Sequence, residues 1–233
     1  MKMSSFPKIK NQKNENIFIF DFDGTLFRYD LLIFYLIHHF FAYNDKFFLV
    51  RSFISAYDQG LTSIRKKIFL NFSNKYELTT CFENFSRTFY VRYFLRKKLF
   101  LFFKKLNKDN ETVFIVTANY QELVKAFLEE NDIFERENFK IVGTELPKKN
   151  QLSHKKILKG KFKAKKISHL IKEKKIKISD IDIYNFFDDY EDKYLCTLAR
   201  HNILVSIYNR KKMKFFKKNF NAIFYNDFMK KIS

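Results

Sequence analysis

Polar side chains that could bind a phosphate or a metal ion follow four apolar runs of the sequence: Asp21 with Asp23 two residues later, Thr117, Asp188 and Asn209. In an open α/β sheet, ligands bind at the carboxyl ends of the strands, so these side chains are expected to meet at one edge. Carboxylates gathered in this way repel one another unless a cation lies between them, and hard oxygen ligands suit Mg²⁺. A lone aspartate at a strand end is more often a helix N-cap, but four such ends on one edge disfavour that interpretation.

The apolar runs that position these residues lack the alternation of a half-buried strand. Continuous runs of this kind are typical of strands buried on both faces of a parallel sheet. We therefore expect strands over residues 17–20, 113–116, 181–187 and 203–208, with a short fifth strand at 140–142. Helical patterns at residues 121–130 and 163–174 lie between them. This alternation predicts a doubly wound α/β fold with a mostly parallel sheet.

The stretch from residue 29 to residue 106 differs from the rest of the chain. It lacks clear strand punctuation, and its apolar residues recur at helical spacings, for example from Phe94 and Leu95 to Leu99. We interpret it as an all-helical insertion, or cap. The core then comprises residues 14–28 and 107–233, and residues 1–13 form a disordered polar arm. The basic, aromatic tail after Arg210 is expected to close over the sheet as a helix.

The charge of the chain favours anionic partners. Its 233 residues include 45 Lys and Arg against 25 Asp and Glu, a formal net charge of +20. Phosphorylated metabolites, an acidic membrane surface and nucleic acid all fit this balance, although an AT-biased genome would also produce it. No recognisable nucleic-acid-binding pattern accompanies the charge, so nucleic acid is not the expected partner.

Cysteine usage and apolar runs bear on the compartment. Cys81 and Cys196 form no Cys-x-x-Cys pair, which argues against a disulfide scaffold or a zinc cluster and agrees with a reducing cytoplasm. Residues 1–15 lack the apolar stretch of a signal peptide. The longest apolar run, residues 31–43, is shorter than the roughly 20 residues of a spanning helix. We expect a cytoplasmic protein, either soluble or peripheral to the inner face of the membrane.

The run Asp21-Phe22-Asp23-Gly24-Thr25-Leu26 is similar to the first motif of the haloacid dehalogenase superfamily. The resemblance implies that Asp21 is a nucleophile and that Asp23 is the acid that protonates the leaving oxygen and later activates water. The spacing suits this chemistry, because residues i and i+2 of an extended segment point the same way. Both residues are also implied metal ligands, Asp23 through its main-chain carbonyl. The presence of Asp23 favours phosphatase over dehalogenase chemistry.

Two further segments resemble the second and third motifs of the superfamily. The strand ending at Thr117-Ala118-Asn119 implies that these residues bind phosphoryl oxygens, helped by the N–H groups at the start of the next helix. The third motif supplies a lysine that bridges the nucleophile and the phosphate. Lys163, in Gly160-Lys161-Phe162-Lys163, is the preferred candidate, and Lys166 fits nearly as well.

The fourth motif of the superfamily is a strand that ends in acidic residues, and the segment from Phe187 to Asp192 resembles it. Asp188 is the implied metal ligand. The second acid is either Asp189, directly adjacent, or Asp192, four residues on, and Asp192 is preferred. Relatives usually carry Gly or Ser before the first acid, where this chain has Phe187.

The segment Gly143-Thr144-Glu145-Leu146 is similar to one in phosphoserine-phosphatase-like members, which also carry a helical cap after the first motif. The resemblance implies a Mg²⁺-dependent phosphomonoester hydrolase that acts on a small phosphorylated metabolite through an aspartyl-phosphate intermediate. One alternative is a lipid-linked substrate, such as phosphatidylglycerophosphate, at an anionic membrane surface. A phosphoryl transferase and a non-catalytic anion-binding module remain as alternatives of another class.

Overall fold

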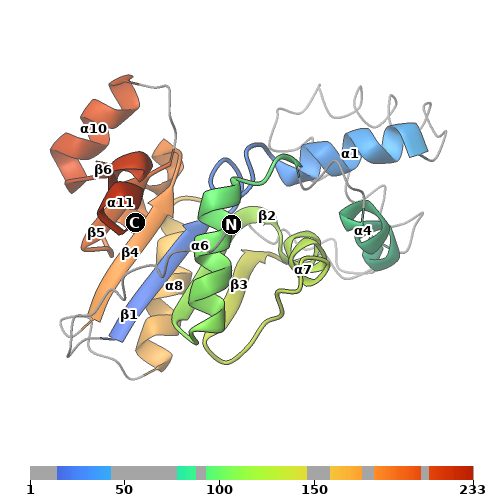
Figure 1. The fold of residues 1–233 in the computed structure, drawn as a ribbon, viewed down its shortest axis with the longest axis horizontal. Helices are drawn as coiled ribbons and strands as arrows, with labels where there is room; N and C mark the ends of the chain where they lie inside the picture. The colour runs from blue at the N-terminus through green and yellow to red at the C-terminus, as the bar shows by residue number, and fades with distance from the viewer. Residues whose placement is uncertain are drawn as a thin grey trace.

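The structure is a computed structural model that describes residues 15–42, 78–87, 93–145, 158–174, 181–205 and 210–232. Its centre is a six-stranded, all-parallel sheet of order β3-β2-β1-β4-β5-β6 (Figure 1). The strands are β1 (Glu15–Asp21), β2 (Thr112–Tyr120), β3 (Phe139–Thr144), β4 (Ile181–Phe187), β5 (His201–Leu204) and β6 (Ile223–Phe224). The predicted α/β class and parallel sheet are confirmed.

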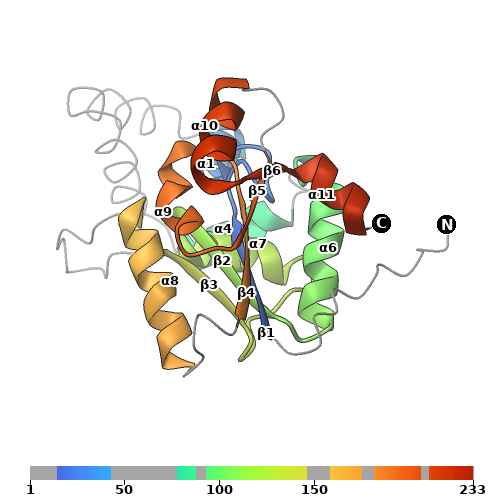
Figure 2. The same ribbon diagram turned by 90° about the vertical axis from the view of Figure 1, so that its left-hand side faces the viewer.

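Helices cover both faces of the sheet. On one face lie α6 (Lys97–Lys108), α7 (Gln121–Glu129) and α11 (Tyr225–Ile232), and on the other lie α8 (Lys161–Glu173), α9 (Lys193–Cys196) and α10 (Arg210–Phe220) (Figure 2). The strands alternate between the two apolar cores, since Phe18 and Phe20 contact the first and Ile17 and Ile19 the second. The continuous apolar run of β1 therefore results from burial on both sides.

The positions of β1 and β4 agree with the predicted strands, whereas β2, β5 and β6 differ from the prediction. Strand β2 runs on to Tyr120, with a register irregularity between Val116 and Tyr120, so the segment carrying Thr117 bulges at the carboxyl end of the strand. Strand β5 begins at His201, two residues before the predicted start. Strand β6 was not predicted, because a two-residue strand leaves no apolar run. Asn209 lies outside the described residues.

The described part of the predicted insertion contains α1 (Leu31–Ala42) and α4 (Leu78–Ser86); α4 lies beside α7, and α1 packs on α4 (Figure 1). Helix α6 covers the end of the predicted insertion. It packs on the sheet through Phe102 and Phe103. This packing favours a proposed insertion that ends before residue 97. No helix in the described ranges is long and apolar enough to cross a membrane.

Candidate active site

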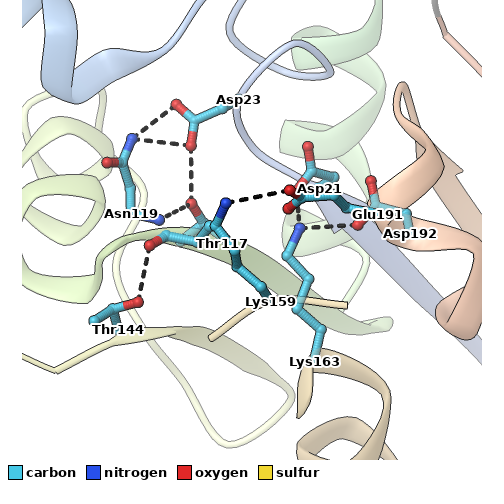
Figure 3. A network of polar contacts seen from close by, with 10 residues as sticks. Asp21, Asp23, Thr117, Asn119, Thr144, Lys159, Lys163, Glu191 and Asp192 are labelled. Atoms are coloured by element: carbon cyan, nitrogen blue, oxygen red, sulfur yellow. Dashed lines mark hydrogen bonds and ion pairs between the residues drawn. The ribbon is translucent and has the colours of Figure 1, made fainter. Parts of the chain in front are cut away.

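Three acidic side chains meet at the carboxyl ends of the central strands. Asp21 ends β1, Asp188 follows β4, and Asp192 lies in the short 3-10 helix η2 (Tyr190–Asp192). One carboxylate oxygen of each lies within 4.8 Å of the others. Lys163 reaches this group from α8, where its Nζ lies 2.7 Å from Asp21 Oδ1 and 2.9 Å from Asp192 Oδ1 (Figure 3). Lys163 is only 4% exposed, so its ammonium group is shielded from water and interacts with these two carboxylates.

Gly24 allows Asp188 to approach the loop after β1. Its φ is +77°, a conformation that side-chain-bearing residues rarely adopt, and a Cβ atom added there would collide with the Asp188 carboxylate. The loop of the first predicted motif and the loop of the fourth are therefore in direct contact. Because of this contact, Gly24, which directly follows Asp23, cannot be exchanged freely for a residue with a side chain.

Asp23 is held beside this cluster by a network of its own. The Thr117 hydroxyl donates a hydrogen bond to Asp23 Oδ2 at 2.9 Å, and Asn119 Nδ2 lies 2.9 Å from both carboxylate oxygens (Figure 3). The main-chain N–H of Leu31, at the start of α1, donates to Asp23 Oδ1 at 2.8 Å. The carboxylate orientation is thus set by β2 and by the first helix of the insertion together.

Burial dominates the electrostatics of the acids. It raises the pKa of Asp21 well above its usual value, with Lys163 opposing and Asp192 adding to the rise. Burial raises the pKa of Asp188 to about 7, and burial with the nearby Asp30 raises the pKa of Asp23 to about 6. Burial by itself lowers the pKa of Lys163, but the carboxylates of Asp21 and Asp192 together raise it. The site therefore holds more negative charge than Lys163 alone balances.

The candidates that the sequence left open lie in different surroundings. Asp192 is 2% exposed and belongs to the acid cluster, whereas Asp189 is exposed, caps η2 and pairs with Lys212. Lys166 is exposed and lines a cavity beside β3 and Leu170 whose lining includes none of the three acids. These positions favour Asp192 over Asp189 and Lys163 over Lys166 as site residues.

The carboxylate of Asp23 is not part of the three-acid cluster. It points into the network of Thr117 and Asn119. Ala118 contributes a main-chain carbonyl that accepts a hydrogen bond from the Thr144 hydroxyl at 2.8 Å. Thr144 thereby ties β3 to the loop after β2.

Two basic residues that were not predicted as site residues donate hydrogen bonds to main-chain oxygens of the loops that carry the acids. Arg96 donates to the carbonyl of Gly24, and Lys212 of α10 donates to the carbonyl of Asp188 at 2.8 Å. Neither residue lies in a motif, and both are surrounded in the sequence by other basic residues. No signal in the sequence distinguishes them.

The sequence matches the family model of haloacid dehalogenase-like hydrolases over residues 18–184. The chain belongs to this family. The matched region runs from β1 into β4, and so includes the loops of Asp21, Thr117 and Lys163. None of the curated protein sequences is detectably similar to the chain.

Several solved structures share the fold of this chain at low sequence identity. A protein of unknown function from Bordetella pertussis Tohama I has a TM-score of 0.68 and 13% identity, covering 90% of this chain and 98% of its own. A phosphoserine phosphatase in its apo form has a TM-score of 0.54 and 13% identity, with coverages of 94% and 100%. A phosphoserine phosphohydrolase-like protein from Francisella tularensis subsp. tularensis SCHU S4 has a TM-score of 0.52 and 19% identity, with coverages of 86% and 92%.

The predicted superfamily, with a phosphoserine-phosphatase-like fold, is therefore confirmed. The family match also agrees with the predicted class of enzyme, a phosphatase.

The residues present fit a divalent cation of the kind this hydrolase family uses. Three carboxylates each place a hard oxygen atom within 4.8 Å of the others, close enough to share one cation, and Gly24 leaves room for Asp188 beside them. Burial first, and neighbouring carboxylates second, raise the pKa values of Asp21 and Asp188, and a bound cation would favour their ionised forms. The donor set contains oxygen atoms only, which favours Mg²⁺ over the softer transition metals.

Proposed function

We propose that the protein is a Mg²⁺-dependent phosphomonoester hydrolase that acts on a small phosphorylated metabolite through an aspartyl-phosphate intermediate on Asp21. The observation that carries the proposal is the ion pair of Asp21, at the end of β1, with Lys163, which also binds Asp192, and the Asp23 carboxylate is held two residues further on. A nucleophile with a positioned acid and an adjacent cation is the arrangement that phosphoryl transfer requires.

The reaction takes two displacements at phosphorus. A carboxylate oxygen of Asp21 attacks the phosphorus, the bond to the leaving oxygen breaks, and Asp23 gives that oxygen a proton. Asp23 then takes a proton from water, the resulting hydroxide attacks the phosphorus, and the bond to Asp21 breaks to release inorganic phosphate. A pKa of about 6 for Asp23 lets the same group act as an acid and as a base near neutral pH.

Lys163 supports the proposal because its ammonium lies beside Asp21, where negative charge builds up on the transferring group. The Thr117 hydroxyl has one hydrogen and donates it to Asp23, so donation to a phosphoryl oxygen requires that this bond be exchanged. While the Thr117 hydroxyl donates to the phosphoryl group, the side-chain amide of Asn119 can keep its hydrogen bonds to the Asp23 carboxylate. Mg²⁺, held by Asp21, Asp188, Asp192 and the Asp23 carbonyl, would neutralise charge on the phosphoryl oxygens.

The compartment and the substrate belong to the same proposal. Cys81 and Cys196 are both buried and are not joined to each other by a disulfide, which suits a reducing cytoplasm. Similarity of fold to phosphoserine phosphatases supports a soluble phosphorylated compound as substrate, and the fold alone does not choose among such compounds.

The test is release of inorganic phosphate by wild type and by Asp21→Asn, with and without Mg²⁺. The panel contains p-nitrophenyl phosphate, phosphoserine, sugar phosphates and phosphatidylglycerophosphate. We expect Mg²⁺-dependent release from a soluble compound that falls at least about a thousandfold in Asp21→Asn, because the amide is a poor nucleophile. Asp189→Asn is the matched control and should keep the wild-type rate, since Asp189 lies outside the acid cluster.

Other results of this panel would overturn parts of the proposal. Release from phosphatidylglycerophosphate alone would favour the lipid-linked substrate. Transfer of the phosphoryl group to an added alcohol in preference to water would indicate a transferase. No release from any compound by folded protein would favour an anion-binding role.

A further inference from the structure

The two connections between the core and the insertion are paired with each other. Phe27 and Leu95 form an isolated antiparallel bridge. On either side of it the Arg28 N–H donates to the Phe94 carbonyl at 2.9 Å and the Arg96 N–H donates to the Leu26 carbonyl at 3.0 Å. We call residues 26–28 and 94–96 the hinge pair. It joins the chain leaving the first motif to the chain returning from the insertion.

The side chain of Arg96 extends from the hinge pair to the loop of the first motif. Its Nε lies 3.3 Å and its Nη2 3.1 Å from the Gly24 carbonyl oxygen, so both N–H groups share one acceptor. The guanidinium is half-buried, and burial together with the neighbouring Arg28 lowers its pKa. Within the described ranges it forms no ion pair, and its hydrogen bonds go to the Gly24 carbonyl alone.

Gly24 passes this contact on to the acid cluster. Its Cα packs directly against the Asp188 carboxylate, without a side chain between them. From the other side, Lys212 binds the Asp188 carbonyl at 2.8 Å and the Asp189 carboxylate at 3.1 Å. Each of the two loops in contact is therefore bound by one cation: Arg96 binds the main-chain oxygen of Gly24, and Lys212 binds that of Asp188. A shift of the Gly24 main chain would change the position of Asp188 relative to Asp21 and Asp192.

We infer that Arg96 is a positioning residue that holds the Gly24 main chain against Asp188, so that the hinge pair fixes the geometry of the metal-binding acids. The inference rests on the proposed function in one respect, that the three acids bind Mg²⁺. Arg96 does not touch the reacting atoms. Its role is to set the separation of carboxylates that come from different strands, as outer groups do around metal ligands.

The sign of a mutational effect distinguishes positioning from simple electrostatics. Removing a positive charge near Asp188 would by itself strengthen Mg²⁺ binding. Loss of positioning weakens it. We therefore expect Arg96→Met to bind Mg²⁺ about tenfold or more weakly than wild type, although the site becomes more negative. Arg96→Lys keeps the charge but loses the two-point contact with the carbonyl, so it should also weaken Mg²⁺ binding.

The experiment is titration calorimetry of the full chain with Mg²⁺ alone, with phosphate release and circular dichroism measured on the same samples. Arg28→Met is the matched control, because it removes an arginine from the same hinge pair whose guanidinium has no hydrogen bond to the loop of Gly24. It should keep wild-type Mg²⁺ affinity. In Arg96→Met, saturating Mg²⁺ should restore part of the lost rate, as a metal-geometry defect requires.

Tighter or unchanged Mg²⁺ binding by both folded Arg96 variants would overturn the inference, and so would equal weakening by Arg28→Met. Mg²⁺ binding by wild type without phosphate release would overturn the proposed function and leave the Arg96 comparison valid. Absence of Mg²⁺ binding by wild type would overturn both.

Discussion

At the scale of single residues, the conformation of Gly24 links backbone to chemistry. Gly24 and Gly160 both have positive φ, +77° and +49°, and both border the site. They differ in what surrounds them. A Cβ at Gly160 would meet the Tyr194 ring at an ordinary 3.6 Å, whereas a Cβ at Gly24 would collide with the Asp188 carboxylate. The pair therefore separates the effect of backbone strain from the effect of displacing an acid.

Gly24→Ala and Gly160→Ala make this separation measurable. Both should lose about 1–2 kcal/mol of unfolding free energy, because each forces a side-chain-bearing residue to positive φ. Only Gly24→Ala should also weaken Mg²⁺ binding, by about tenfold or more, since Asp188 must move. Calorimetric titration with Mg²⁺ and urea unfolding test both quantities. Equal Mg²⁺ affinity of the two variants would contradict the assigned role of the Gly24–Asp188 contact.

At the scale of elements, aromatic pairs fix the two central strands and the helix beneath them. Phe18 stacks on Tyr184 at 5.0 Å and Phe20 on Phe186 at 4.5 Å, each pair lying directly opposite in the β1–β4 register. Helix α6 adds Phe103, whose ring meets Phe20 edge-on at 5.6 Å. The register between β1 and β4 sets the relative position of Asp21 and Asp188, so this packing stabilises the geometry of the acid cluster.

Phe103→Ala should reduce the unfolding free energy by about 3–5 kcal/mol, because it leaves a cavity among packed rings. Leu101→Ala on the same helix is the control, since Leu101 is 44% exposed and should change the free energy by less than about 0.5 kcal/mol. Urea denaturation of both variants measures the difference. Similar losses for the two would show that α6 is not part of the core.

The sheet was predictable because both of its faces are buried, which leaves continuous apolar runs at β1 and β4. Strand β6 was not predictable from two residues. In the site, the acids and Lys163 could be proposed from resemblance to family motifs. Arg96 and Lys212 could not, because they bind main-chain oxygens 72 and 24 residues away in the sequence. Such contacts depend on the fold and leave no local pattern.

At the scale of the whole molecule, the stability of the fold depends on the protonation of the acid cluster and on the metal that we propose it binds. The chain carries a net charge of +20, yet three of its acids are gathered in a buried site. Folding raises the pKa of Asp188 from 3.8 to about 7 in the metal-free chain. The stability that Asp188 contributes as a protonated acid is present below about pH 4 and is lost as the pH rises through about 7.

Mg²⁺ binds the deprotonated form, so its stabilising effect should grow over the same interval. We expect saturating Mg²⁺ to raise the Tm more at pH 8 than at pH 5.5, as measured by differential scanning calorimetry. Asp188→Asn should remove most of this shift at both values. A shift of the same size at pH 5.5 and pH 8 in wild type would show that the metal-binding acids are ionised throughout.

The hinge pair is joined by main-chain hydrogen bonds, and this has a consequence for how the enzyme can diversify. Bonds between backbone groups place few demands on the side chains that lie between residues 28 and 94. Apart from the start of α1, whose Leu31 N–H binds the Asp23 carboxylate, the insertion can therefore change its sequence, its length and the compound it admits while the contacts of the core are kept. A foreign insertion grafted between these two points should be accepted if it keeps the N–H contact of Leu31 with Asp23 and covers Phe127, which α4 and the hinge pair shield from water.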